Sequence, residues 1–124
     1  MIFVMGGAYQ GKLDYAKTAF SLSDGEIFTC TGAEIDFSKR CINALEVFCY
    51  ACVVRDMDPV AYFQAHGDAW KDSILICGDL SGGVVPVDPV LRQWRHATGL
   101  LSQYLAGQAR QVSRIFCGLE QLLK

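Results

Sequence analysis

The chain has 124 residues, of which 52% are hydrophobic and 19% are charged, and this composition is typical of a folded globular domain rather than a disordered segment. A net charge of −2 gives no broad basic field, so we expect no nucleic-acid partner. No apolar run approaches the roughly 20 residues of a membrane span. No basic segment precedes the apolar residues at the N-terminus, so we interpret them as a strand rather than a signal peptide. We therefore expect a single cytoplasmic domain over residues 1–124 with no membrane partner.

The first residues predict a strand, a glycine-rich loop and a helix. The apolar run 2–5 indicates a buried strand, and the helix is expected from about Gly11 to Phe20. Gly6, Gly11 and Lys12 have the spacing of the phosphate-binding P-loop, G-x-x-x-x-G-K-[ST]. In such a loop, backbone N–H groups and the helix dipole surround phosphate oxygens, and the lysine reaches the outer phosphates. The residues expected to bind the nucleotide are Gly6, Gly7, Ala8, Tyr9, Gln10, Gly11, Lys12 and Leu13.

Leu13 is the one departure from this motif. It stands where a serine or threonine hydroxyl normally binds Mg²⁺, and leucine has no oxygen to offer. The loop therefore keeps its groups for phosphate and loses its usual metal ligand.

The middle of the chain predicts one short strand and two helices. Residues 26–30 indicate the strand, and apolar residues then recur at three- and four-residue steps as far as Val53. This period predicts a long amphipathic helix that begins near Asp36 or Ser38. Asp58 and Pro59 begin another helix, which is expected to end near His66.

A second glycine-rich loop follows a second buried strand. The apolar run 73–77 predicts that strand, Asp79 stands directly after it, and a long helix is expected from Pro89 with Gly107 near its end. Residues 112–117 indicate a last strand, and Gly118 precedes a short apolar tail. Strands that alternate with helices indicate an α/β domain with a mostly parallel sheet, in which ligands bind beyond the carboxyl ends of the strands.

The cysteines are interpreted as core residues. Four of the six lie in strongly apolar segments, where cysteine packs as a small hydrophobic residue: Cys41, Cys49, Cys52 and Cys77. The C-x-x-C at Cys49 and Cys52 has no second Cys/His pair at zinc-like spacing, so it is only a weak indication of a metal site.

Three ordered motifs resemble the bifunctional adenosylcobinamide kinase / adenosylcobinamide-phosphate guanylyltransferase family of cobalamin biosynthesis. The first is the loop 6–12. The second is a strand leading into the segment 78–86, where the family has Asn-Glu-x-Gly-x-Gly-[IV]-Val-Pro. The third is the family pattern R-x-[FW]-R-x-x-x-G, which matches the four residues Arg92, Trp94, Arg95 and Gly99. The resemblance covers about residues 1–17 and 74–124 and leaves the middle of the chain poorly matched.

This resemblance implies a P-loop NTPase-like three-layer fold and an enzyme that uses ATP or GTP with Mg²⁺. It assigns catalytic roles to Lys12 and Asp79, with Asp79 also as the metal-organising acid where the family has Glu. It implies substrate binding by Gly82, Gly83, Arg92 and Arg95. From the residues alone, Asp79 is equally suited to capping a turn, and the two arginines to surface or subunit contacts.

The family's guanylyltransferase step uses a histidine after the first helix, and this chain has none between Phe20 and Pro59. Its only histidines are His66 and His96, neither of which stands at the nucleophile position. Two classes of function therefore stay open. One is a nucleotide-dependent cobinamide kinase, and the other is a nucleotide- or corrinoid-binding relative without turnover. Relatives assemble as oligomers, and homo-oligomerisation is expected here through Trp94, Leu101 and Tyr104.

Overall fold

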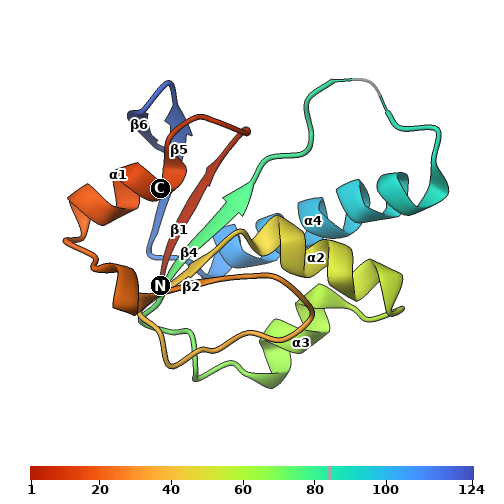
Figure 1. The fold of residues 1–124 in the computed structure, drawn as a ribbon, viewed down its shortest axis with the longest axis horizontal. Coiled ribbons are helices and arrows are strands. Elements are labelled where there is room, and N and C mark those ends of the chain that lie inside the picture. Colours follow the sequence, from red (N-terminus) through yellow and green to blue (C-terminus); the bar gives the residue numbers. More distant parts are fainter. Residues whose placement is uncertain (84) are drawn as a thin grey trace.

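A computed structural model describes residues 1–83 and 85–124, so Val84 of the second glycine-rich loop lies outside the described residues. The strands and helices alternate along most of the chain (Figure 1). The strands are β1 (Ile2–Gly6), β2 (Ile27–Thr29), β3 (Cys41–Asn43), β4 (Ile74–Gly78), β5 (Gln111–Phe116) and β6 (Leu119–Leu122). The helices are α1 (Lys12–Ala19), α2 (Leu45–Val54), α3 (Pro59–Ala65) and α4 (Pro89–Gln108), with a 3-10 turn, η1, at Asp24–Glu26.

The six strands form one sheet in the order β2-β3-β4-β1-β5-β6. β1 lies in the centre and is parallel to β4 and to β5, while β2 and β3 extend the parallel part beyond β4. Among the strands of the described residues, β6 alone runs antiparallel to its neighbour. The predicted α/β class and the parallel pairing of the first strand with the strand at 74–78 are both confirmed.

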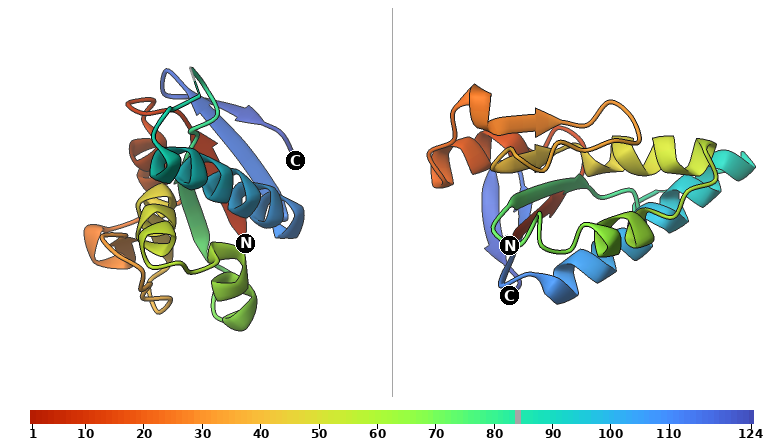
Figure 2. Two further views of the ribbon diagram at one scale, coloured as in Figure 1. Left: turned by 90° about the vertical axis from the view of Figure 1, so that its right-hand side faces the viewer. Right: turned by 90° about the horizontal axis from the view of Figure 1, so that it is seen from below.

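Helices cover both faces of this sheet (Figure 2). On one face α1 packs through Ala16 against Val4, Ile76 and Ile115. On the other face α2, α3 and α4 enclose the larger core, whose fully buried members include Phe3, Phe48, Phe63, Leu75, Leu101 and Leu105. Because β1 and β4 are buried on both faces, they read as continuous apolar runs in the sequence.

An aspartate and a proline begin two of the helices, and the sequence predicted both residues for α3 and the proline alone for α4. The Asp58 carboxylate accepts the N–H of Val60 at 2.9 Å, and Pro59 occupies the first position of α3. The Asp88 carboxylate likewise accepts the N–H of Val90 at 2.8 Å at the start of α4. Each side chain satisfies a donor that the first helical turn leaves unpaired.

The middle segment contradicts the prediction of one long helix from Asp36 or Ser38. The Asp36 carboxylate instead accepts the N–H of Ser38 in a local turn at 3.0 Å. β3 follows at Cys41–Asn43, and the positive φ of 62° at Ala44 separates it from α2. The prediction failed because the residues of a three-residue buried strand matched the spacing expected for a helix.

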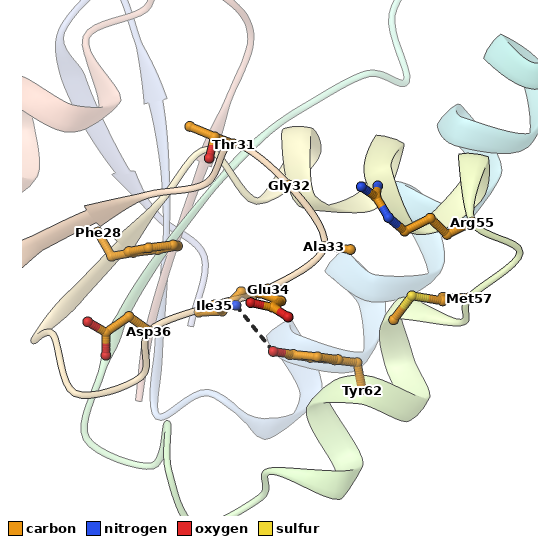
Figure 3. Close-up of a pocket in the computed structure, with 10 residues that line it drawn as sticks. All are labelled: Phe28, Thr31, Gly32, Ala33, Glu34, Ile35, Asp36, Arg55, Met57 and Tyr62. Atoms are coloured by element: carbon orange, nitrogen blue, oxygen red, sulfur yellow. Dashed lines mark hydrogen bonds between the residues drawn. The ribbon is translucent and has the colours of Figure 1, made fainter.

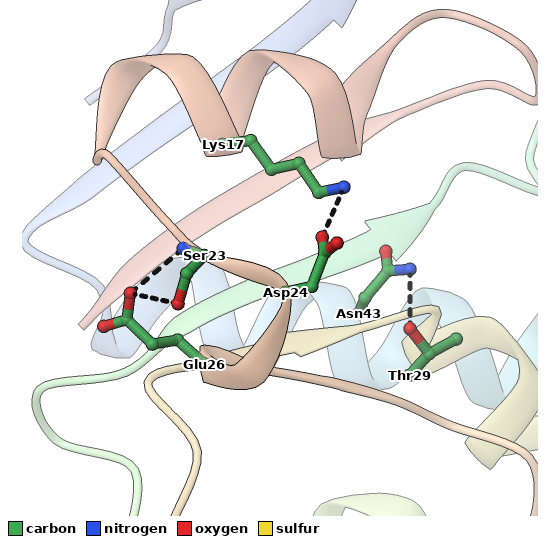
Figure 4. Close-up of polar contacts among 6 residues, drawn as sticks. All are labelled: Lys17, Ser23, Asp24, Glu26, Thr29 and Asn43. Atoms are coloured by element: carbon green, nitrogen blue, oxygen red, sulfur yellow. Dashed lines mark hydrogen bonds and ion pairs between the residues drawn. The ribbon is translucent and has the colours of Figure 1, made fainter.

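Local polar contacts fix the connection between α1 and β2 (Figure 4). The Glu26 carboxylate accepts both the N–H and the hydroxyl of Ser23 at 3.0 Å, which forms a capping box around η1. Lys17 of α1 forms an ion pair with Asp24 at 2.9 Å. These exposed contacts set the path of the chain rather than its stability, since exposed ion pairs contribute little.

The end of the chain is a hairpin strand rather than an apolar tail. Cys117 (φ 52°) and Gly118 (φ 75°) form a two-residue turn between β5 and β6. Positive φ at both turn residues matches the twist of the flanking strands. The sequence prediction missed β6 because all four of its residues are exposed and show no alternation.

The cysteine prediction is confirmed for the four residues named. Cys41, Cys49, Cys52 and Cys77 are all buried, as is Cys30, and Cys117 is exposed. Within the described residues, no helix combines the length and the apolar character needed to cross a membrane.

Candidate functional site

The two glycine-rich loops meet at the carboxyl edge of the sheet. Gly6 and Gly78 are paired residues at the ends of the adjacent strands β1 and β4. One residue further on, the N–H of Asp79 donates to the carbonyl oxygen of Gly6 at 2.8 Å. Neighbouring loops at the carboxyl ends of parallel strands are the usual ligand-binding region of such a sheet.

The first loop curls tightly between β1 and α1. The Lys12 ammonium folds back over it, and Nζ donates to the carbonyl oxygen of Gly7 at 2.8 Å. Gly11 has a φ of 87°, which favours glycine, and Tyr9 has a φ of 60° with its side chain fully exposed. The N–H groups at the start of α1 and the lysine charge are therefore presented at the same edge.

The loop is also held from the β5–β6 side. The Gln10 side-chain oxygen accepts the N–H of Cys117 at 2.7 Å, and the Gln10 carbonyl accepts the N–H of Gly118 at 2.8 Å. The loop motif places Gln10 only among the phosphate-binding residues and gives no indication of this anchoring. The contact joins residues 107 positions apart, so no local pattern could have indicated it.

Asp79 caps a turn in its own loop. Its Oδ1 accepts the Ser81 hydroxyl at 2.6 Å and the Ser81 N–H at 2.9 Å. The Ser81 hydroxyl above all, with its N–H and the positive charges of Arg114 and Arg95, holds the pKa of this carboxyl below its ordinary value, against the opposing effect of burial. Arg95 completes the arrangement by donating to the carbonyl oxygen of Ser81.

A cavity of about 510 Å³ lies between this loop and α4. Arg92, Arg95 and His96 line it from the helix, Asp79 and Leu80 from the loop, and Met5 from β1; Gly99, Ser102 and Gln103 are among its other lining residues. Two arginines against one carboxylate give the cavity a net positive charge in a chain that is negative overall. Anionic or hydroxyl-bearing ligands are the class that such a lining suits.

The structure thus brings together most of the predicted site residues, and it separates others. Gly82 and Gly83 are exposed and do not line the α4 cavity, although Arg92 and Arg95 do. His66 lies elsewhere, at the end of α3, with Nδ1 2.8 Å from the carbonyl oxygen of Tyr62.

The residues of α4 that were expected to contact a partner subunit differ in their exposure. Leu101 is fully buried in the core and cannot meet a partner subunit, which corrects the expectation for that residue. Trp94 and Tyr104 are half-buried, and the Trp94 indole N–H donates to the carbonyl oxygen of Glu46 at 2.7 Å.

Two side chains at this edge were missed by sequence analysis. Arg114 on β5 acts on the Asp79 carboxyl, and the Glu46 carboxylate in the first turn of α2 accepts the N–H of Gly78 at 3.0 Å. Both come from segments that the motifs do not cover, and only the sheet order brings them to the loops.

Another cavity, of about 730 Å³, lies away from the glycine-rich loops (Figure 3). The segment after β2 and the ends of α2 and α3 enclose it, and the Tyr62 hydroxyl accepts the N–H of Ile35 at 3.2 Å on its wall. Glu34, Asp36 and Arg55 are its charged lining residues. No sequence motif indicated this cavity.

The described residues include no group of three or more His, Cys, Asp or Glu side chains placed to hold a metal ion. Magnesium in nucleotide sites commonly takes one or two carboxylates and completes its shell with phosphate and water oxygens. The carboxylates at this edge are sufficient in number for such a site, because Asp79 and Glu46 both stand next to the end of β4.

Comparison with known proteins identifies no family: no protein-family model matches the chain, and no curated protein matches it significantly.

Proposed function

We propose that this domain binds a nucleotide in the loop 6–12 and is a cobinamide kinase/guanylyltransferase-like protein of cobalamin biosynthesis, with the kinase step as its activity. The observation that carries the proposal is the strand–loop–helix at the sheet edge. There the Lys12 Nζ lies 2.8 Å from a loop carbonyl and α1 begins at Lys12 itself. A P-loop NTPase-like fold belongs to the same proposal.

The reaction proposed is transfer of the γ-phosphoryl group of ATP or GTP to the hydroxyl of the aminopropanol arm of cobinamide. The bond from the γ-phosphorus to the β–γ bridging oxygen breaks and the nucleoside diphosphate leaves with that oxygen. A new phosphorus–oxygen bond forms to the acceptor, and the hydroxyl proton is released to water. Catalysis of this kind consists of positioning and charge neutralisation. Lys12 and the loop N–H groups would neutralise phosphate charge, and the α4 cavity with Arg92 and Arg95 would take the acceptor.

Magnesium would contribute by neutralising charge on the transferring phosphates. Because Leu13 offers no ligand, Mg²⁺ would be held by the carboxylates at the end of β4. The family resemblance favours Asp79 among them. With no metal ligand from Leu13, the loop 6–12 itself should contribute less to the Mg²⁺ dependence of nucleotide binding than a complete P-loop does.

The alternative is a nucleotide- or corrinoid-binding relative without turnover. The missing hydroxyl at Leu13 supports it, because loss of a single electrostatic contact can remove about 3 kcal/mol of transition-state stabilisation. Such a loss slows the reaction by orders of magnitude and leaves phosphate binding in place.

The guanylyltransferase step is not part of the proposal. A covalent GMP intermediate needs a histidine nitrogen in line with the α-phosphate of a bound GTP. His66 stands outside the loop region, and His96 borders the α4 cavity rather than the loop 6–12.

A cytoplasmic location and self-association complete the proposal. Exposed apolar side chains lie on the edge hairpin, namely Phe116, Leu119, Leu122 and the following Leu123. An exposed edge strand also leaves a row of unpaired backbone groups, which a second copy can pair.

Isothermal titration of ATP and GTP, each with and without Mg²⁺, tests nucleotide binding. Lys12→Ala should weaken it at least tenfold, or about 1.4 kcal/mol. Lys17→Ala is the matched control, since Lys17 lies on the same helix and forms an ion pair with exposed Asp24, away from the loop. Equal affinities of the two variants would show that the loop is only a turn. A cobinamide phosphorylation assay on the same sample then separates the kinase from the binding protein.

A further inference from the structure

Two paired glycines leave the ends of β1 and β4 bare on the α1 face of the sheet. Along these strands, Val4 and Ile76 are paired and both belong to the core beneath α1. Side chains alternate between faces along a strand, so the next residues on that face are Gly6 and Gly78. Neither has a side chain, and the space over them is open to groups from other elements.

Lys12 lies over Gly6, and Glu46 lies over Gly78. A Cβ placed on Gly6 would lie 3.4 Å from Cγ and Cδ of Lys12. A Cβ placed on Gly78 would lie 3.0 Å from Cδ and 3.2 Å from Oε1 of Glu46. Because Gly6 and Gly78 are paired on adjacent strands about 4.8 Å apart, the two side chains stand over neighbouring strand ends.

Glu46 is held firmly in this position. Its Oε2 accepts the N–H of Gly78 at 3.0 Å, and its backbone carbonyl accepts the indole N–H of Trp94 at 2.7 Å. These two bonds connect α2 to β4 on one side and to α4 on the other. The carboxylate is therefore a fixed, half-buried negative charge next to the phosphate loop.

Asp79 lies toward α4, at the cavity that it lines. Its carboxylate is bonded twice to Ser81, and its charged neighbours are Arg95 on α4 and Arg114 on β5. Of the two acids at the end of β4, the one that lies over the Gly6–Gly78 pair is thus Glu46, which no sequence motif indicated.

We infer that Glu46 is the carboxylate that holds the divalent cation of a nucleotide bound in the loop 6–12. This inference rests on the proposed nucleotide binding and names the residue that serves in place of the hydroxyl missing at Leu13. A fixed carboxylate beside the phosphates repels a metal-free nucleotide, and it attracts the same nucleotide when a cation lies between them. Glu46 should therefore weaken binding without metal and strengthen binding with it.

The test is the affinity for GTP in excess Mg²⁺ divided by the affinity in EDTA, measured by titration calorimetry. Glu46→Gln keeps an oxygen to accept the Gly78 N–H and removes the charge. We expect this ratio to fall at least tenfold in Glu46→Gln, with metal-free binding unchanged or tighter. Asp79→Asn tests the competing assignment, which the family resemblance favours, and we expect it to leave the ratio within about threefold of the wild type.

An unchanged ratio in Glu46→Gln, or an equal loss in Asp79→Asn, overturns the inference while nucleotide binding itself stands. Absence of GTP binding by the wild type under both conditions overturns the proposed function together with it. A second measurement needs no variant: Mn²⁺-GTP should broaden the backbone amide resonance of Glu46 more than that of Ser81. The reverse order would assign the cation to Asp79.

Discussion

Gly6 is the residue with the least room at the candidate site. A Cβ at this position would lie 2.6 Å from the carbonyl oxygen of Ile115, which is backbone and cannot turn aside. The motif glycine is thus required by the packing of β1 against β5 as well as by any ligand. Its presence alone is therefore not evidence of phosphate binding, whereas the position of the Lys12 ammonium is more informative.

We predict that Gly6→Ala lowers the free energy of unfolding by about 1–3 kcal/mol, because an added methyl group forces the backbone of β5 to move. Urea denaturation of the variant measures this. Gly25→Ala is the control, since a Cβ there meets no atom within 4 Å. A loss in Gly6→Ala no greater than in the control would mean that the strand ends adjust freely.

At the scale of elements, α4 carries a glycine in its interior without a packing reason. Gly99 lies midway along α4 and lines the α4 cavity, and a Cβ there would meet no atom within 4 Å. Glycine inside a helix costs about 0.8–1.0 kcal/mol relative to alanine. A function that needs the open space is one reason to keep it.

Gly99→Ala should therefore raise the free energy of unfolding by up to about 1 kcal/mol and weaken binding of any ligand in the cavity. Thermal unfolding gives the first effect, and the KM for the acceptor in the phosphorylation assay gives the second. Gly107→Ala is matched to it, because that glycine is also in α4 with open space around it and does not line the cavity. If both variants change KM alike, the cavity is not the acceptor site.

How far the sequence could predict each element depended on the length of its pattern. β1 and β4 come from short continuous apolar runs, and α4 has a proline at its start, so these elements were predicted to within a residue or two. β3 has three residues and β6 is wholly exposed, and neither is long enough or regular enough to show a period of its own.

The same limit applies to the candidate site. Its glycines and Lys12 are close in sequence and form a motif, whereas Glu46, Arg114 and the Gln10 contact reach the edge only through the order of the strands. Sheet order depends on long-range packing, which local patterns do not encode.

At the scale of the whole molecule, buried thiols tie the stability of the fold to pH. Five of the six cysteines are buried, and they are distributed over both core clusters. Burial is the main cause that raises the pKa of these thiols from an ordinary value of 9.0, to about 12 for Cys30 and Cys49 and to about 11 for Cys41 and Cys52. Burial also raises the pKa of Cys77 well above its ordinary value.

A raised pKa in the folded state means that the thiols lose their protons first in the unfolded chain. Their contribution to stability is complete below pH 9 and is lost as the pH rises through the folded values, since the unfolded state then binds fewer protons. We predict that the free energy of unfolding falls steeply between pH 9 and about 11–12, as measured by urea denaturation at a series of pH values.

Cys41→Ala should make this fall shallower, because it removes one buried thiol, whereas Cys117→Ser should not, because that thiol is exposed. The wild type and the two variants have the same tyrosines and lysines. The titration of those residues therefore cancels when the slopes of unfolding free energy against pH are compared. An equal slope in Cys41→Ala and the wild type would show that the core thiols do not carry the alkaline sensitivity, and that the core around β3 admits water before the protein unfolds.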